Sequence, residues 1–173
     1  MCIKTLPGWL AFCHGDRRSV TSLICESIRL RLTGKLLFEP PTEGIMVYEN
    51  GRAFKPFRKA IVSTNSVQSR FPVLFKVQFR FRNLPFRVNR LLSWLPVPLI
   101  TGQPGFISKT WYQKPDSSEF MGIYEFNNIE AATEYWKSLP VKMMKRRAVP
   151  DSLKAEIITF NAHLGRYVRN SVG

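Results

Sequence analysis

Hydrophobic and polar side chains alternate most regularly over residues 73–82, "VLFKVQFRFR". The apolar members are Val73, Phe75, Val77, Phe79 and Phe81. A period of two is typical of a strand with one face buried and one face polar. We therefore expect a strand here, with Arg80 and Arg82 on its polar face. If that face met a pocket instead of solvent, Arg80 could stabilise an anion there.

The segment after this strand carries an apolar pattern with a period near 3.6. Apolar side chains recur between Leu84 and Leu95, which predicts a helix that Pro96 and Pro98 end. Residues 105–113 and 120–126 follow as two aromatic-rich runs joined by "KPDSSE". We expect these runs to form a β-hairpin.

A second helical stripe follows the hairpin. It begins with a capping pair, Asn127 and Glu130, and ends near Pro140. The run "KMMKRR" at 142–147 is predicted to be a basic turn, and residues 155–160 a last strand. The order β-α-β-β-α-β predicts an α+β, ferredoxin-like domain over residues 71–164, with two helices on one face of an antiparallel sheet.

Residues 1–70 are less clearly specified and are expected to be partly disordered. A helix is predicted over 19–32, a short strand over 45–48, a hairpin turn at Asn50-Gly51, and a linker over 63–69. The boundaries are therefore an N-terminal region at 1–70, the domain at 71–164 and a tail at 165–173.

The charge is strongly basic, with a net value of +14. The excess is +6 over residues 1–70 and +8 over the rest, so no single arm carries it. The three cysteines form no CxxC pair and the chain has two histidines, which argues against a closed zinc site. We expect a cytoplasmic protein without a transmembrane segment. The basic, partly amphipathic segment 17–32 leaves an organelle-targeting or membrane-surface role open.

The sheet face opposite the helices is expected to be open and apolar, and such a face usually marks an interface. It could stack RNA bases, as in RRM domains of the same topology. The third strand of the domain, "EFMGIYEF", argues against this, because Glu119 stands where that motif has a cation and Met121 and Ile123 stand where it has rings. The alternative is pairing with a second copy of the chain.

The segments "PGFISKTWYQ" and "EFMGIYEFNNIEAATEYWKS", within Pro104–Ser138, carry a family resemblance. With "KRRAVP" and "AEIITF" further on, residues 71–160 resemble small monooxygenases of the dimeric α/β-barrel superfamily, relatives of the antibiotic-biosynthesis monooxygenases. The resemblance implies a homodimer formed through the open sheet face. It also implies a substrate pocket between sheet and helices, and oxidation of a small aromatic or polyketide-like molecule by oxygen without metal or flavin.

Within that framework we selected eight candidate site residues. The catalytic candidates are Tyr124, Trp111, Arg80 and His163, and the substrate-binding candidates are Tyr112, Trp136, Gly122 and Asn161. Tyr and Trp can donate hydrogen bonds to a developing oxyanion, and a histidine is a base at neutral pH. Each has a structural alternative: Trp111, Tyr112 and Trp136 in the core or an interface, Gly122 as a packing glycine, and His163 as a solvated side chain.

Three functions remain open from the sequence. The first is a cofactor-independent monooxygenase, which requires an enclosed cavity of at least about 300 Å³. The second is a non-catalytic module for small-molecule binding or dimerisation, and the third is a basic nucleic-acid-binding domain. No metal site is expected.

Overall fold

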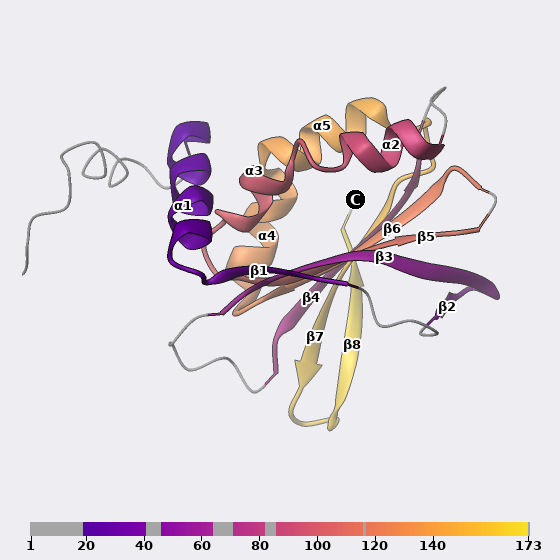
Figure 1. Cartoon of the computed structure of the whole chain (residues 1–173). Coiled ribbons are helices and arrows are strands. Elements are labelled where there is room, and N and C mark those ends of the chain that lie inside the picture. The colour runs from indigo at the N-terminus through magenta and orange to yellow at the C-terminus, as the bar shows by residue number, and fades with distance from the viewer. Residues whose placement is uncertain (1–18, 41–45, 64–70, 82–85, 116, 173) are drawn as a thin grey trace, which may run out of the picture.

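The computed structural model describes residues 19–40, 46–63, 71–81, 86–115 and 117–172. Within these ranges, eight strands form an antiparallel sheet in the order β1-β3-β5-β6-β4-β7-β8, with β2 paired to β3 outside that path. Figure 1 shows the helices gathered on one side of the sheet. The predicted α+β, ferredoxin-like class is confirmed.

The central four strands carry the predicted topology. They are β4 (Val73–Arg80), β5 (Phe106–Gln113), β6 (Glu119–Phe126) and β7 (Lys154–Asn161). Between β4 and β5 lie α2 (Phe86–Leu92) and α3 (Val97–Thr101), and between β6 and β7 lie α4 (Ile129–Lys137) and α5 (Leu139–Arg147). The sheet order β5-β6-β4-β7 places β4 and β6 at its centre.

Two prolines that were expected to end helices instead begin new ones. Pro98 and Pro140 are the second residues of α3 and α5, within the first turn, where a missing backbone N–H leaves no intrahelical bond unmade. The predicted basic turn at 142–147 is therefore wrong, because these residues form most of α5.

The N-terminal region adds a helix and three strands to the domain. They are α1 (Val20–Leu32), β1 (Leu36–Glu39), β2 (Val47–Glu49) and β3 (Arg52–Val62). β3 pairs with β5 along its length, and β1 pairs with β3. No strand was expected at β3, because its apolar residues fall on both faces and Arg58 takes one of the regularly alternating buried positions. Its register with β5 shifts between Pro56 and Arg58. The linker predicted at 63–69 lies almost wholly outside the described residues.

α1 packs against α3 on the helical side of the sheet. Ser27 Oγ and Thr101 Oγ1 are 2.7 Å apart and both residues are buried. A Cβ atom at Gly102 would lie 2.0 Å from the Leu23 carbonyl oxygen, so this close approach of two backbones requires glycine. The helix predicted at 19–32 is confirmed, and it is part of the same packed structure as the central strands.

The segment at 165–173, predicted to be a tail, contains another strand. Residues Arg166–Ser171 form β8, which pairs antiparallel with β7 across six positions from Glu156↔Ser171 to Asn161↔Arg166. Most of its side chains are exposed, which explains why a hydrophobic pattern did not reveal it.

The main core lies between the helices and the sheet. Phe75, Val77 and Phe126 from the strands meet Tyr135 of α4 and Val141 of α5, all nearly inaccessible to solvent. The aromatic rings of the core meet both edge to face and in parallel: the Phe75 and Tyr135 rings cross at 81° with centroids 5.4 Å apart, whereas the Tyr124 and Phe126 rings lie 8° from parallel.

The sheet face opposite the helices is partly covered and partly charged. Lys76 Nζ lies 2.8 Å from Glu49 Oε1 of β2 and 3.0 Å from Glu156 Oε2, while Arg169 Nη1 is 3.2 Å from Glu49. Glu49 and Lys76 are both buried. The expectation of a uniformly open and apolar face is therefore wrong, because the β2–β3 hairpin places Glu49 against it.

The hairpin itself follows the sequence prediction. Asn50 and Gly51, with φ of 50° and 73°, form its two-residue turn, in which both positions need left-handed backbone. None of the helices among the described residues is long and apolar enough to cross a membrane.

Candidate active site

A cavity of about 70 Å³ lies between the sheet and the helices. Its wall is formed by β4, β5 and β6 below and by α4, α5 and the turn between α2 and α3 above. The lining is largely apolar and includes Phe79, Leu95, Trp111, Phe120, Met143 and Met144. The volume is smaller than the roughly 300 Å³ at the lower end of small-molecule pockets.

Lys109 of β5 places an amine in the wall of this cavity. The residue is 5% exposed, and its Nζ donates a hydrogen bond to the Tyr124 hydroxyl at 2.7 Å. Nζ also lies 4.2 Å from the centroids of both the Trp111 and Tyr124 rings. No carboxylate of the described residues forms an ion pair with it. Burial, together with the nearby positive charge of Arg58, holds the pKa of Lys109 well below its usual value of 10.5.

Strand register brings Lys109 to this position. Lys109 is the direct partner of Tyr124 on β6, and Trp111 is the partner of Gly122. An irregularity between Phe106 and Ser108 shifts the alternation, so that Lys109 and Trp111 share the helix-facing side of β5. The Lys109 side chain thus projects from β5 into the core between the sheet and the helices.

Tyr124 and Gly122 on β6 fit together closely. A Cβ atom at Gly122 would lie 2.9 Å from Cε2 of Tyr124, so the glycine leaves room for the phenol ring. Burial raises the pKa of the Tyr124 hydroxyl above its usual value. Burial, followed by the influence of Tyr124, raises the pKa of Tyr135 as well. Both phenols are therefore neutral and can donate hydrogen bonds.

Two arginines add positive charge around the cavity. The Arg58 guanidinium stacks 3.7 Å from the Trp94 ring and 5.5 Å from the Trp111 ring, and donates to Ser93 Oγ at 2.9 Å. Burial and the neighbouring Arg90 lower the pKa of Arg58 to about 10. Arg147 of α5 lines the cavity and donates to Asn89 Oδ1 at 3.3 Å. Of the residues that the structure describes, those that line the cavity include no Asp or Glu.

The structure brings four of the eight candidate residues to the cavity. Tyr124, Trp111, Tyr112 and Gly122 line it. Trp136 packs instead against the Lys145 amine, at 3.6 Å, and against Phe75.

The other three candidates lie away from the cavity. Arg80 is exposed at the end of β4. Asn161 is the last residue of β7 and His163 lies in the turn that follows, where Asn161 Oδ1 accepts from the His163 backbone N–H at 3.0 Å. His163 is exposed, so it offers no base to the cavity.

Lys109 is the residue that the sequence analysis missed. A signal was present, because Lys109, Trp111 and the hairpin-paired Tyr124 could have been placed on one face once the register was known. Among the described residues, no three His, Cys, Asp or Glu side chains gather as a metal site would require.

Two comparisons bear on these features, and the first concerns the fold. The chain is similar to the crystal structure of an uncharacterized ferredoxin-fold protein related to antibiotic biosynthesis monooxygenases, from Listeria monocytogenes 4b F2365. The TM-score is 0.50 at 11% identity, over 75% of this chain and 85% of the other. At this identity the likeness establishes the ferredoxin fold.

The second comparison concerns the family. Residues 86–166 match the family model described as "Putative mono-oxygenase ydhR". The resemblance to small monooxygenases that the sequence indicated is thereby confirmed, over α2 to the start of β8 and with β4 outside the match. No curated protein matches the chain.

Proposed function

We propose that this protein is a monooxygenase that oxidises a small, acidic aromatic molecule with molecular oxygen and without metal or flavin, using Lys109 as its base. The observation that carries the proposal is the Lys109 amine, buried in a cavity wall and hydrogen bonded to Tyr124, with no carboxylate from the described ranges paired with it. The family match supports the reaction class. The lowered pKa of Lys109 supports the role of base, because a neutral amine can accept a proton.

The chemistry requires little from the protein beyond a base and a dry site. The neutral Lys109 amine takes a proton from an acidic C–H or O–H of the substrate, and the resulting carbanion or phenolate passes an electron to oxygen. The two radicals combine to form a C–O bond. Loss of the second hydrogen from that carbon, with cleavage of the O–O bond, gives a ketone or quinone and water. The balance is R₂CH₂ + O₂ → R₂C=O + H₂O.

The groups around Lys109 can stabilise the negative charge that forms on the substrate during the reaction. Once Lys109 is protonated, the substrate anion pairs with it, and Arg147 lies in the same wall. The neutral phenol of Tyr124 can donate a hydrogen bond to the developing oxyanion, provided its own hydrogen bond with Lys109 rearranges. The apolar lining excludes water, which strengthens each of these interactions.

The cavity must enlarge to hold an aromatic molecule. Met143 and Met144 of α5 form part of its wall, and both are partly exposed. Methionine side chains have three rotatable bonds and repack readily around a ligand. We propose that movement of these two side chains admits the substrate beside Lys109.

The test is oxygen consumption with three probes of increasing size: 1-naphthol, anthrone and dihydroxyanthrone. The wild type is expected to form the corresponding quinones and to incorporate one atom from ¹⁸O₂, as read by mass spectrometry. Lys109→Met is expected to lower the rate by at least about 100-fold, the lower range for loss of a general base. Lys145→Met removes an exposed lysine of α5 and is the matched control, expected to retain the wild-type rate.

Two outcomes would contradict the proposal. One is equal oxidation by the wild type and Lys109→Met. The other is binding of all three probes without oxidation, which would favour the second candidate, a non-catalytic small-molecule binding module. The small volume of the cavity is the observation that keeps this candidate open.

A further inference from the structure

We propose that an exposed apolar surface on α1 and α2, ringed by arginine and lysine, docks this protein onto an anionic lipid bilayer. The surface, called here the α1–α2 patch, joins Ile24, Ile28 and Leu32 of α1 to Val88 and Leu91 of α2 and to Trp94 and Leu95 of the following turn. All seven are exposed, Leu32 by 72% and Leu91 by 69%. This inference goes beyond the proposed reaction and does not depend on it.

The exposed apolar side chains of α1 form a stripe along one face of the helix. Ile24, Ile28 and Leu32 recur at every fourth residue, so they lie along one face of the helix. The opposite face, with Leu23, Ser27 and Leu30, is buried against the rest of the structure. Burial of the core therefore does not account for the exposed stripe, and a contiguous exposed apolar surface marks an interaction site.

The two halves of the patch are connected at the end of α1. The Arg31 guanidinium lies 5.7 Å from the Phe38 ring, and the Phe38 and Trp94 ring centroids are 5.2 Å apart. Ser27 of α1 contacts Thr101 of α3, the helix that follows the turn carrying Trp94.

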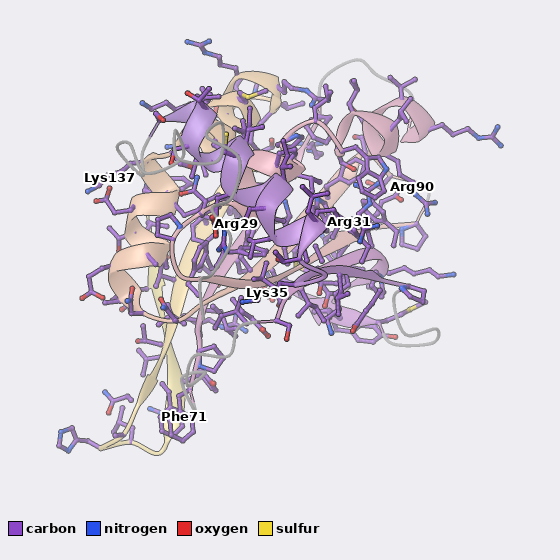
Figure 2. All side chains as sticks on the ribbon, turned by 60° about the vertical axis from the view of Figure 1, so that its left-hand side comes forward. Arg29, Arg31, Lys35, Phe71, Arg90 and Lys137 are labelled. Atoms are coloured by element: carbon purple, nitrogen blue, oxygen red, sulfur yellow. The ribbon has the colours of Figure 1, made fainter. Side chains whose placement is uncertain are left out.

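Positive charge surrounds the patch. Figure 2 shows Arg29, Arg31 and Lys35 around the end of α1, with Arg90 on the same side of the molecule. Arg87 of α2 is also exposed. Residues 86–115 contain no Asp or Glu, and the one acidic residue of α1, Glu26, is paired with Arg29 at 2.6 Å.

This combination of groups selects an anionic bilayer as the occupant. Apolar side chains can enter the boundary between headgroups and acyl chains, and each nearby cation adds attraction to acidic lipid. Tryptophan, amphipathic and half-exposed here, is enriched at that boundary. A second copy of the chain is disfavoured as the occupant, because it would bring two rings of like charge together.

The α1–α2 patch adjoins the cavity, so docking at the patch would bring the bilayer close to the cavity. Leu95 is 64% exposed in the patch and also lines the cavity, together with its neighbours Ser93 and Pro96. A bilayer on the patch would thus lie next to one wall of the cavity. Apolar molecules dissolved in the bilayer would then reach that wall without crossing water.

The experiment is flotation of the full chain with vesicles of phosphatidylcholine alone or mixed with phosphatidylglycerol. Binding is expected only with phosphatidylglycerol and is expected to weaken in high salt. Lys35→Gln with Arg87→Gln should reduce partitioning by about 25-fold, since each cation contributes roughly fivefold, about 1 kcal/mol. Leu32→Ser with Leu91→Ser should reduce it at least tenfold.

Matched controls lie elsewhere on the surface. Leu164→Ser changes a leucine that is 55% exposed in the β7–β8 turn, and Lys137→Gln removes an exposed charge of α4; both should bind like the wild type. Brominated lipid should quench tryptophan fluorescence in the wild type and in Trp136→Phe, and much less in Trp94→Phe. Circular dichroism confirms that each variant is folded.

Three results would overturn the proposal. The first is no flotation with phosphatidylglycerol, and the second is equal loss of binding in the patch variants and the Leu164→Ser control. The third is a concentration-dependent dimer that the Leu32→Ser, Leu91→Ser variant abolishes while vesicles bind neither protein. That result would assign the patch to a second copy of the chain.

Discussion

The amine of Lys109 and the hydroxyl of Tyr124 are 2.7 Å apart, on directly paired positions of β5 and β6. Both residues are almost completely buried. Proteins rarely place a lysine in a core without a carboxylate, because the charged form loses its hydration there. Burying Lys109 in this way lowers the stability of the fold, and such destabilising groups are common at functional sites.

The first prediction is that Lys109→Met stabilises the fold at neutral pH, by about 1 kcal/mol or more. In the unfolded chain the lysine holds its proton up to its usual pKa of 10.5, whereas the folded protein releases it at lower pH. Folding stability of the wild type should therefore rise with pH between these two pKa values. Thermal unfolding of the wild type and of Lys109→Met across that pH range measures this change in stability.

The difference between the two proteins should narrow as pH rises towards 10.5. A wild-type stability that does not change with pH over this interval, relative to Lys109→Met, would show that burial does not shift the lysine pKa.

The second prediction concerns the space beside Tyr124. Gly122→Ala puts a methyl group 2.9 Å from the Tyr124 ring, and the ring must move. We expect a loss of about 1–3 kcal/mol in unfolding free energy, the usual cost of overpacking a core. The shifted hydroxyl should also lose its contact with Lys109 and lower the oxidation rate. In a Tyr124→Phe background the effect of Gly122→Ala on the oxidation rate should shrink. Equal effects in both backgrounds would show that Gly122→Ala does not act through the Tyr124 hydroxyl.

The third prediction concerns the ion pairs opposite the helices. Burial raises the pKa of Glu49, but the hydrogen bond and charge of Lys76 and the charge of Arg169 outweigh it, so the net pKa is below 4.5. Glu49→Gln should cost about 3 kcal/mol at pH 7, near the low end for breaking a buried pair, since Glu156 still faces Lys76.

The contribution of Glu49 is present above its unfolded-state pKa and disappears as pH falls through the lower, folded-state pKa. Denaturant unfolding of the wild type and Glu49→Gln should therefore give converging free energies in acid. A difference that is constant from pH 7 to pH 3 would argue against the ion pair as the cause.

The fourth prediction concerns the homodimer. Pairing through the sheet face opposite the helices stays a prediction, and the position of Glu49 restricts it to the part of the face that β2 leaves uncovered. Ile123 of β6 is partly exposed and does not line the cavity. Ile123→Glu should convert a dimer to a monomer in light scattering without changing binding of naphthol. A wild-type monomer at high concentration would contradict the dimer.

The central topology was predictable because its signals are local. The alternation over 73–81 specifies β4 directly. The capping pair predicted at Asn127 and Glu130 was one residue early, because the N-cap of α4 is Asn128, whose side chain accepts from the Ala131 N–H. β3 escaped prediction because its apolar residues fall on both faces and Arg58 takes a buried position, and β8 because its side chains are mostly exposed. Helix α5 was missed because a proline can begin a helix as well as end one.

The site was harder to predict than the fold for a physical reason. Which face of β5 a residue occupies depends on the irregularity after Phe106, so Lys109 could not be placed from spacing alone. Arg58 reaches the site from β3, a strand far away in sequence, and only the register with β5 brings it beside Trp111. His163 was selected for its chemistry, but its turn holds it in solvent.

The most direct test of the account is the titration of Lys109 itself, followed by NMR of the ¹³Cε-labelled lysines and assigned with Lys109→Met. We predict that one lysine titrates well below 10.5, and that oxidation of naphthol rises over the same pH interval. A Lys109 that titrates in the range of the surface lysines, or an oxidation rate that does not follow its titration, would contradict the account.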